Sequence, residues 1–310
     1  LGRGMDNDHQ VKAGLSFKWQ VELSSNQDKT MYIKCWGARG SSPVSGQEFL
    51  KYGGNTTCIE VRAGKPRQTI LIDFGTGALP MGREFVRQGN KNLDVLLTHT
   101  HWDHIMGFPL FPLLFVPGSR IKFHFNPTFQ GNPEKLVVLN MMKSPHFPVN
   151  PQRLPARFSY QQTGSYFKIG SVKITSIPLS HPNLGLGYRL EYAGKNFVFL
   201  TDNELGHAHP GGKSLDEYIR FCEGADLLIH DAEYFDQHEY KQTKGFGHST
   251  VDNVLDLAAK AGVKSLGLFH HNRERTDNEI DQLIHQLNQT APEKYTFNIF
   301  AVYQGLEINL

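Results

Sequence analysis

The chain has 310 residues, an apolar content of 39% and a formal net charge of +2 at pH 7, values that are ordinary for a globular protein with a sizeable core. This nearly neutral charge argues against a basic surface for long nucleic acids, and no stretch approaches the roughly 20 apolar residues that span a bilayer. Three widely spaced cysteines without a C-x-x-C pair argue against disulfides or a thiolate zinc site, so we expect a cytoplasmic protein.

Short apolar runs that end in glycine, aspartate or histidine alternate along the chain with stretches of helical periodicity. Strands are predicted at 31–36, 58–62, 69–72, 93–97, 172–179, 196–200, 226–229 and 265–269. Helices are predicted at 133–142, 214–223, 249–261 and 277–288. Helices interleaved with strands in this way indicate an α/β fold in which helices cover mixed sheets.

The first 30 residues differ in character from the rest of the chain. They are polar and lack an apolar segment, and the residues before Met5 resemble the remnant of a tag. We therefore expect a flexible tail over 1–30 and a single folded domain over 31–310. Within that domain, residues 105–165 are rich in proline and aromatic side chains, and we interpret them as a segment that covers the functional site.

The segment from Thr98 to His104 contains four side chains that can bind a metal. They are His99, His101, Asp103 and His104, and they follow the apolar run 93–97, so they lie where a buried strand ends. Imidazole nitrogens suit zinc, and a neighbouring carboxylate suits a second, harder coordination position or a general base. The alternative is a polar loop that is rich in histidine, but the density of ligands favours a metal site.

Further potential ligands follow the later strand-like runs. They are His181, Asp202, Asp231 and His270. Taken singly, each has a plain structural explanation: Asp202 could cap a turn, and His181, which precedes Pro182, could lie in a surface loop. Residues at strand ends converge on one crevice in α/β proteins. Together with the first motif, this pattern favours one shared site.

These motifs carry a family resemblance. The order His-x-His-x-Asp-His, then His181, Asp202 and His270, resembles the metallo-β-lactamase superfamily over residues 31–310. The sequence motifs at 36–41 and 52–56, together with Asp73-x-Gly75-x-Gly77, resemble those of its phosphodiesterase-type branch. That branch contains ribonuclease Z-like and phosphoribosyl cyclic phosphodiesterase-like hydrolases. The resemblance implies an αββα four-layer sandwich, in which two mixed sheets are flanked by helices and the metals lie at one edge.

The resemblance also implies a ligand set for two divalent metal ions, with zinc expected and manganese or iron(II) as alternatives. Carried over, it assigns His99, His101 and His181 to one metal, Asp103, His104 and His270 to the other, and Asp202 as a bridge. His271 competes with His270, which we favour because it matches the Leu-x-His ending of the superfamily. Two such cations can hold a bridging hydroxide for attack on a phosphodiester, which Asp103 would also orient.

Two further residues are implied as the source of the proton for the leaving group. Asp231 and His248 lie in segments that resemble an acid–histidine dyad of ribonuclease Z-like enzymes, although that family has glutamate where this chain has Asp231. His248 would then contact the phosphate or act as a general acid. The alternative for its segment is a helix cap at Ser249. Asp73 is interpreted as a residue that holds a ligand imidazole, or simply as a turn former.

The expected function is hydrolysis of a small or cyclic phosphodiester by a dinuclear metal centre. Alternatives are a glyoxalase II-like thioester or ester hydrolase, ribonuclease Z-like RNA processing, and a metal-binding module without catalysis. Antibiotic hydrolysis is not expected, because Asp202 stands where some zinc β-lactamases have cysteine. Arg39, Arg273 and Arg275 are candidate phosphate contacts, unless they only solvate a surface. Long nucleic acid and membrane partners are not expected, and the apolar covering segment could form a homodimer surface.

Overall fold

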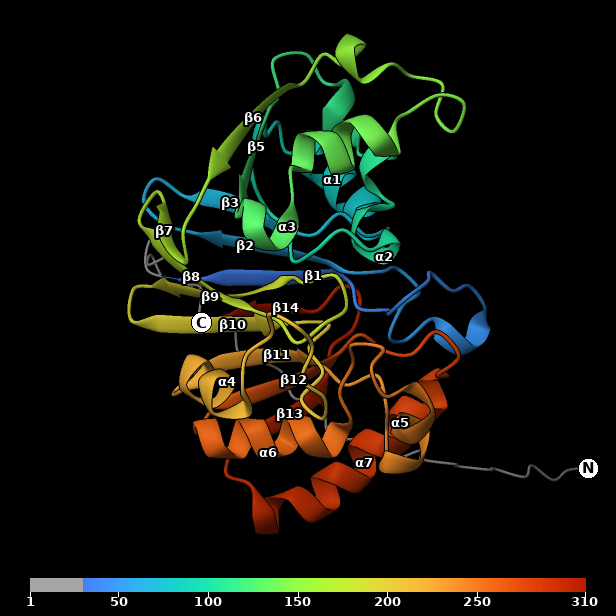
Figure 1. Ribbon diagram of the computed structural model, residues 1–310, viewed down its shortest axis with the longest axis vertical. Helices are drawn as coiled ribbons and strands as arrows, with labels where there is room; N and C mark the ends of the chain where they lie inside the picture. Colours follow the sequence, from blue (N-terminus) through green and yellow to red (C-terminus); the bar gives the residue numbers. More distant parts are fainter. Residues whose placement is uncertain (1–29) are drawn as a thin grey trace, which may run out of the picture.

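Two β-sheets of seven strands each lie face to face, and helices cover their outer faces (Figure 1). The computed structural model describes residues 30–310. This arrangement is the four-layer αββα sandwich that the sequence motifs implied, so the predicted fold is confirmed. The tail predicted over 1–30 lies, except for Thr30, outside the described residues.

The first sheet combines antiparallel and parallel strands. In spatial order it consists of β14 (Glu307–Asn309), β1 (Tyr32–Gly37), β2 (Cys58–Ala63), β3 (Gln68–Ile72), β4 (Asn92–Leu96), β5 (Arg120–Phe125) and β6 (Arg157–Gln162). Strands β14 to β3 pair antiparallel, whereas β3 to β6 pair parallel. The parallel strands β3 and β4 therefore end at the same edge of the sheet.

The second sheet has a similar mixed topology. In spatial order it consists of β13 (Asn298–Ala301), β12 (Ser265–Phe269), β11 (Leu227–Asp231), β10 (Lys195–Leu200), β9 (Leu186–Tyr192), β8 (Val172–Pro178) and β7 (Tyr166–Ile169). Strands β10 to β13 are parallel, and β7 to β10 are antiparallel. The carboxyl ends of β10, β11 and β12 therefore lie side by side.

Helices form the two outer layers (Figure 1). They are α1 (Ala78–Arg87), α2 (Trp102–Ile105), α3 (Pro127–Gln130), α4 (Leu215–Cys222), α5 (Gln237–Thr243), α6 (Val251–Ala261) and α7 (Asp277–Lys294). Short 3₁₀ turns occur at Gln47–Phe49, Phe108–Leu110, Pro112–Phe115 and Pro151–Arg153, and a π-helical turn occurs at Glu134–Leu139. No helix within residues 30–310 is both long enough and apolar enough to cross a membrane.

Among the described residues, the three largest apolar cores hold these layers together. Between the sheets, Ile33 and Ile59 share one buried cluster with Phe197 and Phe199. A second cluster joins the second sheet to α4 and α6, and a third joins the first sheet to α1. The sheets are thus buried on both faces, which explains the continuous apolar run 197–200 that ends β10.

The segment 105–165 is part of the first sheet and not only a cover over the site. It supplies β5 and β6, which extend the first sheet in parallel with β4. Neither strand is predicted from the sequence, because the alternation of apolar and polar residues in each is short and lies among prolines. The remainder of the segment forms α3 and short turns, and Leu113 and Val137 of these turns pack with α1 in the outer layer.

Candidate metal centre

Three of the predicted site residues lie at strand ends and share an uncommon backbone conformation. Asp73 follows β3, Asp202 lies two residues after β10, and His270 follows β12, with φ angles of 64°, 56° and 57°. A left-handed conformation costs an L-residue about 1–2 kcal/mol, although aspartate and histidine adopt it more often than most residues. The sharp turn ends each strand abruptly and leaves its polar side chain at the shared edge.

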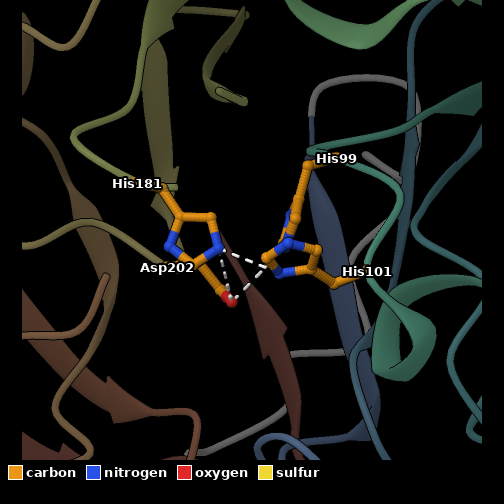
Figure 2. A group of neighbouring side chains, drawn as sticks. All are labelled: His99, His101, His181 and Asp202. Atoms are coloured by element: carbon orange, nitrogen blue, oxygen red, sulfur yellow. Dashed lines mark hydrogen bonds and ion pairs between the residues drawn. The ribbon is translucent and has the colours of Figure 1, made fainter. Parts of the chain in front are cut away.

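The first group of potential ligands brings together both halves of the chain. One side-chain atom from each of His99, His101, His181 and Asp202 lies within 4.8 Å of the others. Figure 2 shows the ring nitrogens and the carboxylate directed toward a common point. His181 Nε2 lies 3.1 Å from His101 Nδ1, and Asp202 Oδ2 lies 3.6 Å from His99 Nε2. Such a set of imidazoles with one carboxylate suits a zinc-like cation.

The second group shares Asp202 with the first. It contains Asp103, His104, Asp202 and His270, again with one atom of each within 4.8 Å of the others. Asp202 Oδ1 lies 3.3 Å from His104 Nε2 and 3.5 Å from His270 Nε2. The two oxygens of Asp202 thus face different groups, which is the geometry that a bridging carboxylate requires.

The donor atoms of these groups fit divalent cations. His99 Nε2 and His104 Nε2 are buried, and neither has a hydrogen-bond partner among the described residues. Buried polar nitrogens without a partner are costly. Here both point toward carboxylates at distances too long for good hydrogen bonds, 3.6 Å and 3.3 Å. A bound cation would satisfy the nitrogens and compensate the buried carboxylates together.

A second layer of contacts orients the ligand imidazoles. Asp73 accepts hydrogen bonds from Thr98 and from His104 Nδ1 at 2.8 Å, which leaves His104 Nε2 facing the cluster. His181 Nδ1 lies 3.1 Å from the carbonyl oxygen of Gly247. Each ring therefore has one nitrogen held by the protein and one nitrogen free toward the cluster, as in many metal sites.

The structure places His270, and not His271, in the cluster. His271 Nε2 donates to the carbonyl oxygen of Val302 at 2.7 Å, and its ring packs edge-on against Tyr52. Burial, which no nearby carboxylate offsets, lowers the pKa of His271 to about 3. Its ring therefore serves to join β12 to the chain after β13.

Burial and neighbouring charges shift the pKa values of two ligand histidines, His99 and His270, in opposite directions. Burial, together with the adjacent His104, holds the pKa of His99 well below its usual range. Burial also opposes charge on His270, but nearby carboxylates, Asp202 first, raise its pKa well above that range. Because a metal competes with protons for the same nitrogens, the neutral His99 is ready to bind, whereas His270 must first lose a proton.

Asp231 and His248 lie together beside the second group, but not as a close hydrogen-bonded dyad. Asp231 Oδ2 is 3.6 Å from His248 Nδ1, and its oxygens accept hydrogen bonds from the backbone N–H groups of Asn203 and Ser249. The Asp231 side chain thus ties the loop before α6 to the loop after β10. Thr250, rather than Ser249, caps α6, with its hydroxyl accepting from Asn253.

Glu233 is a site residue that the sequence analysis missed. Its Oε2 lies 3.1 Å from His270 Nδ1 and 3.4 Å from His248 Nε2, and these three residues form another compact group. His248 also stacks on His270, with ring centroids 4.5 Å apart. The signal was present, because side chains two residues apart along an extended chain share a face and Glu233 follows Asp231 by two.

A pocket of about 250 Å³ opens over the two ligand groups. It is lined by Ser41, His101, Trp102, Asp103, His181, Asp202, Phe246 and His248. These described lining residues include no lysine or arginine. The site would therefore have to neutralise an anionic substrate through bound cations and protonated histidine.

The arginines that the sequence suggested as phosphate contacts have structural partners instead. Arg39 is completely buried and donates to the backbone carbonyls of Gly53, Asn272 and Arg275. Arg275 forms an ion pair of 2.6 Å with Glu239. Arg273 is exposed beside Glu274 and does not line the pocket.

A neighbouring pocket of about 290 Å³ shares His101 with the first. Its walls come from α3 and from the turn after β8, and its lining residues are His99, Thr100, His101, Pro127, Thr128, Phe129, Gln130, Gly131, Leu136, Asn183 and Leu184. Residues 127–136 of this wall belong to the segment 105–165 that the sequence analysis interpreted as a cover. The ligand groups therefore have open space on both sides of His101.

A family model described as the beta-lactamase superfamily domain matches residues 68–271, about two thirds of the chain. The chain belongs to the beta-lactamase superfamily. The matched region contains all the candidate metal ligands of both groups. The metal-dependent hydrolase that the sequence motifs predicted is thus confirmed at the level of the family.

Individual relatives agree with that assignment. Ribonuclease Z from Exiguobacterium sibiricum is 25% identical over 258 residues, which cover 69% of this chain and 82% of the relative. The solved metallo-beta-lactamase fold protein YhfI from Bacillus subtilis superposes with a TM-score of 0.64 at 17% identity, covering 91% of this chain and all of that chain. A diphosphatase from the PhnP family gives a TM-score of 0.61 at 19% identity, covering 90% and 97%. The predicted phosphodiesterase-type branch is consistent with these relatives.

Proposed function

We propose that the protein is a dinuclear metal-dependent phosphodiesterase that hydrolyses a small phosphodiester. The observation that carries this proposal is the pair of ligand groups joined by the two oxygens of Asp202. Metal ions bound there would polarise the phosphoryl oxygens and lower the pKa of water toward about 7. Zinc suits the five imidazoles of the two groups, and manganese or iron(II) would also accept the carboxylates.

The side chains of the two ligand groups are assigned to two cations in this proposal. His99, His101 and His181 would hold one cation, and Asp103, His104 and His270 the other, with Asp202 shared. All of these side chains except His101 are buried, so their positions are fixed before substrate arrives. Such preorganisation avoids reorganising the site during the reaction.

In this proposal Asp103 orients the attacking water and His248 supplies the proton for the leaving group. Asp103 Oδ2 accepts a hydrogen bond from the backbone N–H of Ser41 at 3.0 Å, which fixes the carboxylate at the pocket floor where it can orient an attacking water. His248 lines the same pocket, and the carboxylates of Glu233 and Asp231 on either side favour its protonated form. A protonated imidazole in this position can donate to the departing alkoxide.

The charge of the pocket favours a diester as the substrate. A phosphodiester carries one negative charge, whereas monoesters and polyphosphates carry two or more. Because no lysine or arginine is among the described lining residues, only the bound cations and His248 would face the phosphoryl oxygens, which suits the single charge of a diester. The two pockets on either side of His101, about 250 and 290 Å³, provide room for a small substituent on each ester oxygen.

RNA processing is the second candidate, because the curated relatives are named ribonuclease Z. The net charge of +2 speaks against it, since phosphate contacts along an RNA need many cationic side chains. A thioester hydrolase remains a third interpretation of the same ligand motif.

The test compares substrates on one metal-loaded preparation. Bis(p-nitrophenyl) phosphate should be hydrolysed with zinc or manganese, and Asp103→Ala should abolish the reaction, whereas Asp256→Ala on the exposed face of α6 should not. Faster turnover of a glutathione thioester than of any diester would contradict the proposal. Faster cleavage of a 3′-extended transfer RNA than of any small diester would favour RNA processing instead.

A further inference from the structure

Two large aromatic side chains at the candidate site are exposed to solvent. Trp102 and Phe246 have exposed fractions of 69% and 64%, and both line the pocket that contains Asp103, Asp202 and His248. Neither ring belongs to an apolar core among the described residues. Apolar rings gathered at a polar pocket are typical of a binding surface rather than of ordinary surface composition.

The two rings come from opposite halves of the fold but are both held in place by their neighbours. Trp102 begins α2 and stands between the candidate ligands His101 and Asp103. Phe246 stands between Gly245 and Gly247, whose N–H groups both donate to a carboxylate buried after β10. The side chains are therefore exposed on backbones that are anchored on each side, which lowers the entropy cost of binding a ligand.

That carboxylate belongs to Glu204, and it accepts four hydrogen bonds, two of them from the loop of Phe246. Besides the two glycine N–H groups, it accepts from Tyr240 Oη at 2.7 Å and from His209 Nε2 at 2.7 Å. Glu204 is only 1% exposed, so these bonds form in a shielded environment where they are strong. The loop is thus built to present one aromatic ring at the rim of the pocket.

The remaining lining of the pocket determines what these rings can recognise. Of the polar side chains in the lining, only Ser41 and His248 lie outside the two ligand groups, and lysine and arginine are missing from the described lining. Selectivity beyond the phosphate must therefore come mainly from the aromatic surfaces. Flat aromatic groups stack on such surfaces regardless of their hydrogen-bonding edges.

We infer that Trp102 and Phe246 form an aromatic subsite for the planar base of a nucleotide phosphodiester. This inference rests on the proposed phosphodiesterase function and narrows its substrate class. The base of the substrate stacks at the rim while the phosphate lies over the ligand groups at the pocket floor. Two rings at one rim suit a single base, so the subsite favours a mononucleotide diester over a long RNA.

The kinetic test uses two substrates that differ only in the base. They are a cyclic phosphate of adenosine and the same cyclic phosphate of methyl riboside. The ratio of their kcat/KM values should fall about tenfold in Trp102→Leu and in Phe246→Leu, equivalent to ~1.4 kcal/mol of stacking each. Trp102→Phe and Phe246→Tyr should largely retain the ratio. Tyr166→Leu, at an exposed residue outside the pocket, is the matched control.

A binding measurement gives a readout that does not depend on turnover. Adenosine 5′-monophosphate should quench the fluorescence of exposed Trp102 in the metal-loaded protein, whereas ribose 5-phosphate should not. Trp36, which is partly buried and donates to Glu60, serves as an internal reference. Trp102→Phe should remove the quench, and Phe246→Leu should weaken the apparent affinity about tenfold.

The outcomes separate this inference from the function on which it rests. If both substrates are hydrolysed at similar rates and the leucine variants leave their ratio unchanged, the subsite is refuted while the phosphodiesterase stands. If neither substrate reacts, the proposed function fails, and the absence of base-dependent quenching would refute the subsite as well. A change from dimer to monomer in the leucine variants, without a change in the ratio, would instead assign the rings to a contact between copies.

Discussion

Glu233 Oε2 lies 3.1 Å from His270 Nδ1, while Nε2 of the same ring lies 3.2 Å from Asp103 Oδ2. If Nδ1 carries the proton and donates to Glu233, the lone pair of Nε2 faces the cluster. It then cannot donate to Asp103, and the two groups instead face each other as two ligands of one cation do. Carboxylates that hold a ligand histidine in this way fix its tautomer and raise its basicity.

Replacing Glu233 with glutamine should therefore weaken metal binding. The amide would keep the size of the side chain but lose the charge that favours the required tautomer of His270. We expect the affinity for zinc to fall about 10- to 100-fold, the usual effect of losing such a partner. Competition with a chromophoric chelator measures this affinity directly. Glu274→Gln, at a residue with 82% side-chain exposure, is the control, and equal affinities in both variants would contradict the assigned role.

Gly247 and Gly245 offer a matched pair of alanine substitutions. Both have left-handed φ angles, 99° and 90°, so alanine strains the backbone at either position by roughly 1 kcal/mol. A Cβ at Gly247 would lie 1.9 Å from His181 Nδ1, however, whereas a Cβ at Gly245 would meet nothing within 4 Å. Gly247→Ala must therefore displace His181 or its own loop.

We expect Gly247→Ala to lose activity about tenfold or more, because small displacements of a catalytic group are costly. Its metal affinity should fall together with its activity. Gly245→Ala should lose stability to a similar degree in thermal unfolding while it keeps most of its activity. Indistinguishable activities of the two variants would show that contact with His181 does not matter.

Bound metal should stabilise the fold measurably. The ligand groups bury the carboxylates of Asp103 and Asp202 among imidazoles, and these charges are brought together only in the folded arrangement. A cation at 100 times its dissociation constant adds about 2.7 kcal/mol to the free energy of unfolding. Chelation should lower the melting temperature by several degrees, and the shift should shrink in Asp202→Asn but not in the exposed control Asp256→Asn. A melting temperature that is independent of zinc in the wild type would contradict this account.

The sequence predicted the parts of this molecule that depend on local pattern. His99 and Asp202 follow apolar runs, and the periodicity of those runs identified the strands that bring the two residues together. Topology could not be obtained in the same way, because pairing between distant strands leaves no periodic signal. The helix Ala78–Arg87 and the strand Arg120–Phe125 were missed for a related reason, since glycine and proline neighbours obscured their patterns.

Residues that act through tertiary contacts were the hardest to predict. Glu233 follows a motif that drew attention to Asp231, and only its distance to His270 shows which acid contacts the ligand. Glu204 looks like an ordinary turn residue in the sequence. Its carboxylate nevertheless accepts hydrogen bonds from the backbone N–H groups of Gly245 and Gly247, which lie some forty residues later in the chain. Its burial and its four donors become visible only when the two loops are placed side by side.

Asp226 should make the stability depend on pH in a defined direction. It lies just before β11, at the end of the second sheet opposite the ligand groups, and accepts from Asn196 N and Lys264 Nζ, both at 2.8 Å. Burial alone would raise the pKa of Asp226, but these donors outweigh it and bring the pKa below its usual range. A lowered folded pKa stabilises the protein at pH values above the unfolded pKa of about 3.9, and this stability is lost as the pH falls through the folded pKa.

The free energy of unfolding of the wild type should therefore exceed that of Asp226→Asn by about 1 kcal/mol above pH 5, as expected for a hydrogen bond of this kind. The difference should shrink below about pH 4. Urea unfolding at a series of pH values measures it, and titration of the ligand groups cancels because both proteins share them. Lys264→Met should remove part of the same difference, and adding it to Asp226→Asn should cost little more, because the two residues act as a pair. A difference that grew toward low pH would reverse the sign of the linkage and contradict the lowered pKa.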